Sequence, residues 1–77
     1  MIKNVKEAYK IARKIKGYKK YDVCCCREDD ISYFFTYPVY GLPVLRIYKE
    51  KGNYEEIFFG QDYESINEKI VPLSELK

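Results

Sequence analysis

Cys24, Cys25 and Cys26 are the most unusual group of reactive side chains in this 77-residue chain. Thiolates bind metals, but a closed zinc site takes four ligands. The chain has no fourth cysteine and no histidine, so one copy cannot supply such a site. On a strand, Cys24 and Cys26 point to one face and Cys25 to the other, a poor arrangement for a metal or an internal disulfide. We expect three small, reduced apolar fillers and no metal, with an intermolecular thiol contact as the alternative.

Glu28, Asp29 and Asp30 form a second group, of consecutive carboxylates. Carboxylates bind hard cations and act as acid–base catalysts. Adjacent acidic residues between two strand-like segments are more typical of a solvated turn. The glycines lie apart at positions 17, 41, 52 and 60, so they form no phosphate-binding loop. Since histidine, the commonest general base, is also missing, we predict a non-enzyme with no catalytic residue, no cofactor and no small-molecule substrate.

Tyrosine is the third group, with nine residues. Strand alternation predicts one face that carries Leu45, Ile47, Ile57 and Phe59. The opposite face is then a candidate partner-binding surface, formed by Arg46, Tyr48, Tyr54, Glu56 and Phe58. Tyrosine is enriched at protein interfaces, although cross-strand tyrosine pairs can also simply stiffen a sheet.

Charge is distributed unevenly along the chain. Residues 1–20 carry eight cations against one carboxylate, a balance of +7, and the total of +2 then leaves −5 for residues 21–77. Four cations lie on one side of the helix predicted below: Lys6, Lys10, Arg13 and Lys14. They are candidate phosphate contacts for a nucleic acid, or a solvated helix face.

An amphipathic helix is predicted over residues 5–16. Its apolar positions recur within one half of a helical wheel and the cations take the other half. Asn4 and Glu7 have the spacing of a capping box, and Gly17 suits a left-handed stop. Four strands follow at residues 21–27, 31–37, 44–48 and 54–59, and Pro38 and Pro43 bracket a loop between the second and third.

The end of the chain predicts a second, short helix. Asp62 is a candidate cap, and Tyr63, Ile66 and Ile70 have helical spacing until Pro72 prevents continuation. The whole pattern is α-β-β-β-β-α. It predicts an α+β fold in which a four-stranded antiparallel meander carries the N-terminal helix, and the short C-terminal helix, on one face. We expect a single domain over residues 1–72 and a loose tail over 73–77.

This helix-first layout is similar to that of double-stranded-RNA-binding domains, PepSY-type domains and small bacterial immunity proteins. The RNA-binding family places a basic cluster at the start of its last helix, whereas the corresponding segment here carries Glu64 and Glu68. The resemblance covers layout alone and transfers no functional residue.

A small interaction protein is the function that these observations favour. No apolar run approaches the roughly 18 residues of a membrane span and no secretory signal is evident, which predicts a cytoplasmic protein without a membrane partner. Phe, Tyr, Met, Ile, Asn and Lys together far outnumber Gly, Ala, Arg and Pro, a skew that follows AT-rich codons and indicates a microbial or viral source. We predict an accessory or inhibitor module that binds a protein partner or a second copy through the tyrosine-bearing face or an edge strand. The alternative is a nucleic-acid binder that uses the basic helix and exposed tyrosines.

Overall fold

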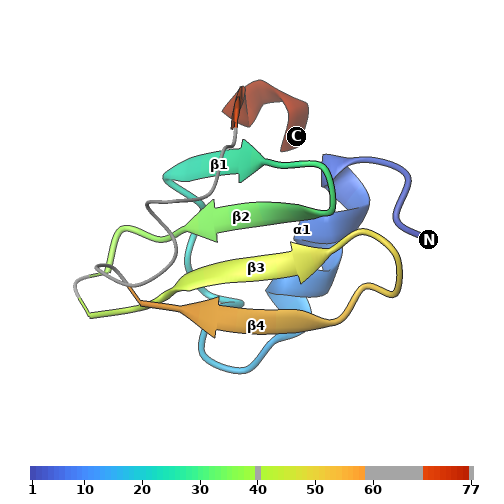
Figure 1. The fold of residues 1–77 in the computed structure, drawn as a ribbon. Helices are drawn as coiled ribbons and strands as arrows, with labels where there is room; N and C mark the ends of the chain where they lie inside the picture. The colour runs from blue at the N-terminus through green and yellow to red at the C-terminus, as the bar shows by residue number, and fades with distance from the viewer. Residues whose placement is uncertain (40, 59–68, 77) are drawn as a thin grey trace.

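The computed structural model describes residues 1–39, 41–58 and 69–76. Its elements are α1 (Val5–Lys14), β1 (Cys25–Glu28), β2 (Ser32–Thr36), β3 (Val44–Tyr48), β4 (Tyr54–Ile57), β5 (Lys69–Val71) and a 3-10 helix, η2 (Leu73–Leu76). The strands form one sheet in the order β4-β3-β2-β1-β5, with antiparallel neighbours throughout. Figure 1 shows α1 behind this sheet. The predicted α+β fold is confirmed, with a fifth strand in addition to the predicted meander.

Helix α1 begins where its cap was predicted and ends two residues earlier than expected. The Asn4 side chain accepts a hydrogen bond from the Glu7 N–H at 3.1 Å, and the Glu7 carboxylate accepts one from the Lys3 N–H at 3.0 Å. Ile15 leaves the helical conformation with ψ of 128°. Gly17 then adopts a positive φ of 96°, and turns lead the chain back toward the sheet. Because those turns occupy the intervening residues, β1 begins at Cys25 and not at residue 21.

Two hairpins form the centre of the sheet. A tight turn joins β1 to β2, and in it the Asp29 N–H donates to the Ser32 carbonyl at 3.0 Å. This is the acidic turn that the sequence predicted. Strand β3 has the predicted bounds, whereas β4 ends at Ile57, before the predicted residue 59, which lies outside the described residues.

The prediction of a C-terminal helix is wrong for residues 69–71. Its first part, residues 62–68, lies outside the described residues, but residues 69–71 form β5, which pairs with β1. Ile70, predicted to point inward, is 69% exposed, and Val71 is buried instead. The open backbone edge of β1 supplies hydrogen-bond partners that outweigh a short helical periodicity, since such local patterns are weak determinants of structure. In the predicted loose tail, η2 places Leu76 against the core.

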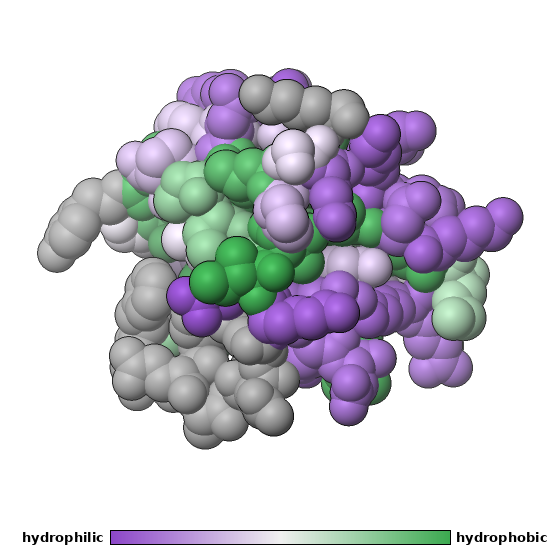
Figure 2. All heavy atoms as spheres, turned by 90° about the horizontal axis from the view of Figure 1, so that it is seen from above, coloured by the Kyte–Doolittle hydropathy of each residue, from purple (hydrophilic) through white to green (hydrophobic). Residues whose placement is uncertain are grey.

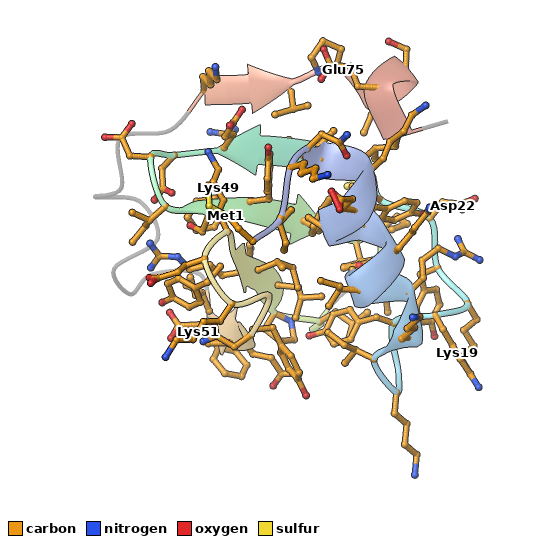
Figure 3. The ribbon with its side chains drawn as sticks, turned by 90° about the vertical axis from the view of Figure 1, so that its right-hand side faces the viewer. Met1, Lys19, Asp22, Lys49, Lys51 and Glu75 are labelled. Atoms are coloured by element: carbon orange, nitrogen blue, oxygen red, sulfur yellow. The ribbon has the colours of Figure 1, made fainter. Side chains whose placement is uncertain are left out.

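The main apolar core lies between α1 and the sheet, as Figure 3 shows from the side. It consists of Ile2, Val5, Ala8, Ala12, Tyr18, Val23, Cys26, Tyr33, Phe35, Tyr37, Leu45, Ile47 and Val71. Ala8 and Ala12 are fully buried, and their small side chains let the helix backbone approach the sheet closely. Burial of a Leu, Ile or Phe contributes about 1.5–3 kcal/mol each, so this layer is the main source of stability.

The β3–β4 turn presses against this helix at Gly52, which gives a testable prediction. Gly52 has φ of +73°, and a Cβ there would lie 3.1 Å from Ile11 Cδ1, whereas Gly17 has φ of +96° with open space around it. We expect Gly17→Ala to lose about 1 kcal/mol of unfolding free energy through its left-handed backbone. Gly52→Ala should lose about 1 kcal/mol more, because Ile11 must move. Urea denaturation of both variants measures the difference, and equal losses would contradict the contact.

Candidate functional site

The turn between β3 and β4 decides which side chains share a face of the sheet. The Tyr48 N–H donates to the Asn53 carbonyl at 2.8 Å, so the turn consists of residues 49–52, an even number. Across an even-numbered turn, odd-numbered residues of one strand lie opposite even-numbered residues of the other. The predicted faces required residues of the same parity to lie opposite each other in the two strands, and a shift of one residue moves every side chain of a strand to the other face.

The predicted partner-binding face is therefore divided between two faces. The β3–β4 pairs are Val44 with Ile57, Leu45 with Glu56, Arg46 with Glu55 and Ile47 with Tyr54. Cross-strand partners share a face. Tyr54 and Glu56 lie on the helix-side face, which carries Leu45 and Ile47, and Phe58 continues their alternation one residue beyond β4. Arg46 and Tyr48 lie on the opposite, outer face, together with Ile57. The prediction that placed all five candidates on one face is wrong.

The outer face is not the open aromatic surface that the sequence suggested. Phe34, Val44 and Ile57 form a second buried cluster there, with exposed fractions of 0%, 1% and 8%. Tyr48 is half-buried, and burial raises the pKa of its phenol. The centre of this face is therefore occupied by the protein's own apolar side chains.

Arg46 belongs to this outer face as a structural residue. Its Nε donates to Ser32 Oγ at 2.8 Å, and its Nη2 lies 3.2 Å from Asp29 Oδ2. The guanidinium carbon lies 4.7 Å from the ring centroid of Tyr48 and 5.1 Å from that of Phe34. Since its side chain is only 15% exposed, Arg46 is engaged within the fold. The contacts of Asp29 and Ser32 with Arg46 were not predicted from the sequence.

Three of the five candidates remain together at the exposed edge formed by β4. The first three residues of β4 are exposed, and Tyr54 and Phe58 are 48% and 52% exposed. Between these two aromatics, the Glu56 carboxylate accepts a hydrogen bond from the Tyr18 hydroxyl at 3.1 Å. Burial raises the pKa of Tyr18, so this phenol remains a donor at neutral pH. The edge therefore presents a carboxylate held between two accessible rings.

The other edge, β5, is less suited to contact a further strand. It is three residues long, and Pro72, which has no N–H donor, follows at once. Figure 2 looks down on this side and shows apolar atoms among polar ones. Ile70 and Leu73 are its exposed large apolar residues, at 69% and 39%.

The basic helix face lies in solvent, as its sequence pattern indicated. Lys6, Lys10, Arg13 and Lys14 are all exposed. Arg13 lies 3.6 Å from Asp22 and donates to the Tyr9 hydroxyl at 3.2 Å. The three lysines form no ion pair with the rest of the described chain. In Figure 3, Lys19 extends away from the sheet just beyond this helix.

The cysteines occupy three different environments. Cys26 is buried, and burial raises the pKa of its thiol to about 12, which keeps it protonated. Cys25 is half-buried and Cys24 is exposed.

In the acidic group, the Glu28 carboxylate lies 2.7 Å from the Lys49 ammonium nitrogen, and that contact lowers the pKa of the Glu28 carboxyl. Within residues 1–39, 41–58 and 69–76, no three Cys, Asp or Glu side chains are grouped to hold a metal.

Comparison with protein-family models, with curated proteins and with solved structures gives no match to this chain. Functional inference therefore depends on its own geometry. In the part that the structure describes, no helix has the length and apolar character needed to cross a membrane.

The Arg46 network predicts a large stability effect. Arg46→Met leaves the largely buried Asp29 carboxylate without its cation, so we expect a loss of about 2–3 kcal/mol in unfolding free energy. In an Asp29→Asn background the same substitution should cost less, because the uncompensated charge is gone. Thermal and urea denaturation of the four proteins in this double-mutant cycle measure the coupling. Strict additivity would place the role of Arg46 outside this network.

Proposed function

We propose that this protein is a non-enzymatic interaction module that binds an extended, basic segment of a partner protein along the edge of β4. The observation that carries this proposal is the exposed edge strand with Tyr54, Glu56 and Phe58 beside it. Addition of a strand to an open sheet edge is a common mode of peptide recognition. Main-chain hydrogen bonds supply affinity in this mode, and side chains supply selectivity.

The backbone of β4 has hydrogen-bonding groups available for such a strand. Antiparallel residues alternate between those that bond their neighbour and those that point away from it. Tyr48 and Asn53 are a bonded pair, so by alternation Tyr54 and Glu56 direct their N–H and C=O groups away from β3. None of the described strands lies on that side. Within the described residues, two donors and two acceptors therefore face away from the sheet, where an incoming segment could bond them.

The side chains of this edge favour a basic partner. Glu55 and Glu56 project from opposite faces of β4, and the Glu55 side chain is 50% exposed although it lies 3.6 Å from Arg46. A Lys or Arg on either face of an added strand would have a carboxylate opposite it, and opposite charges across strands are favourable. The net charge of −5 over residues 21–77 also favours a basic partner.

A second copy of the chain fits this edge less well. Two copies could pair their β4 edges about a two-fold axis so that the outward N–H and C=O groups of Tyr54 in one copy bond those of Glu56 in the other. In that register Glu55 lies directly opposite Glu55 of the second copy. Like charges in that position destabilise a strand pair, so the edge disfavours pairing with itself.

Backbone recognition at Glu56 can be tested with two substitutions. Glu56→Pro removes an N–H that points away from β3, and Glu56→Ala, the matched control, loses the same carboxylate but keeps the N–H. Peptides selected from a displayed library of random 12-residue sequences on the wild-type protein should be rich in Lys and Arg. We expect them to bind Glu56→Pro at least tenfold more weakly than Glu56→Ala in fluorescence anisotropy titrations.

Amide hydrogen exchange supplies the control for location. Bound peptide should slow exchange at Tyr54 and Glu56 and leave Ile70, at the other edge, unchanged. Equal affinity for the two Glu56 variants, or a library that enriches no peptide, would reject the β4 site. If the wild-type protein sediments as a dimer with protected β4 amides, the occupant of this edge is a second copy of the chain and not a partner segment.

The exposed basic face of α1 supports a second candidate function, the binding of nucleic acid through phosphate contacts. Lys6, Lys10 and Lys14 follow one another along the helix at a spacing of four residues, so their ammonium groups line one side. Arg13 adjoins them. Phosphate contacts of this kind give affinity without sequence preference.

Salt dependence tests this second candidate. We expect combined Lys10→Glu and Lys14→Glu substitutions to weaken binding to a 30-base-pair DNA duplex and to reduce the slope of log affinity against log salt by about 2. Lys51→Glu with Lys69→Glu, two exposed lysines outside α1, is the charge-matched control. A slope that is the same for both double variants, or no binding by the wild type at low salt, would refute the candidate.

A further inference from the structure

A pocket lies where β4 ends. It has a volume of about 450 Å³, and Tyr37, Val39, Leu42, Pro43 and Phe58 are among the residues that line it. Phe58 directly follows β4, and the other four precede β3 in the β2–β3 connection. Figure 1 shows this connection beside the end of β4, at the lower left of the sheet. Phe58 is thus a wall that the pocket shares with the end of the β4 edge.

The walls of this pocket are mainly apolar and partly fixed by the core. Tyr37 is buried in the helix-side core and Leu42 packs against it. Pro43 restricts the backbone beside them, since its φ is held by its ring. Phe58, at 52% exposure, forms an accessible wall. A pocket with anchored walls and one accessible aromatic is suited to a single large apolar side chain.

Strand alternation relates this pocket to the carboxylate beside it. Glu56 and Phe58 are two residues apart and project to the same side, so the residues opposite them in an added strand are also two apart and share a face. One of those residues meets the Glu56 carboxylate and the other reaches the Phe58 wall. Tyr54, two residues before Glu56, projects to the same side.

We infer that the pocket beside Phe58 selects the partner segment: it takes a large apolar side chain two positions from a Lys or Arg that meets Glu56. This inference rests on the proposed binding of an extended segment to β4 and assigns its sequence preference. The recognised pattern is a basic residue, any residue, and then Leu, Ile, Met or Phe, read in the direction in which the strand passes Glu56 before Phe58.

The test uses a basic peptide chosen from the selection described above and the same peptide with its apolar residue replaced by Ala. Against the wild-type protein, we expect the Ala peptide to bind about tenfold to a hundredfold more weakly. Against Phe58→Ser the difference between the two peptides should shrink to about threefold or less. Ile70→Ser, which removes another exposed apolar side chain at the far edge, is the matched control and should keep the full difference.

The outcomes separate this inference from the function on which it rests. If peptides protect the β4 amides but the Ala replacement changes nothing, the edge is a binding site and the pocket is not its anchor. If the apolar preference is equally strong in Phe58→Ser, the anchor lies elsewhere and the inference is wrong. If no peptide reaches β4 at all, both proposals fail together.

Discussion

The apolar layer between α1 and the sheet is the constraint on which the rest of this structure depends. Ala8 and Ala12 bring the helix close to Phe35 and Leu45, and all four side chains are fully buried. In a chain of 77 residues little other apolar area is available, because a domain of this size buries only about 60% of its unfolded surface. Every strand must therefore direct one face toward α1, and the remaining chemistry takes the positions that this requirement leaves.

The β3–β4 turn transmits that constraint to the candidate site. Its even number of residues places Tyr54 and Glu56 on the helix side at the margin of the core, and leaves Arg46 on the outer face, where Asp29 and two aromatic rings hold it. The edge strand therefore combines an ordered backbone, supported on one side by β3, with side chains that remain accessible. Preorganisation of this kind lowers the entropic cost of binding a peptide.

Most of the local structure could be predicted from residue patterns. The cap at Asn4, the acidic turn after β1 and the bounds of β3 depend on neighbours a few residues away, so the sequence near each one is sufficient to indicate them. Most of the helix predicted after Gly60 lies outside the described residues, and at Ile70 the prediction was wrong. There the hydrogen-bonding edge of β1, more than forty residues earlier in the chain, determines the conformation, and no local window contains it.

The sequence by itself determined the α+β class, the amphipathic helix with its basic back, and the segments that form the four meander strands. Their periodicity records which residues avoid water within each element, and that information is local. Only the tertiary structure decided how the strands align, since one residue of register in the turn exchanges the two faces of β4. It separated Arg46 and Tyr48 from Tyr54, Glu56 and Phe58, and it placed the β2–β3 connection beside the end of β4, because these contacts join residues that are distant along the chain.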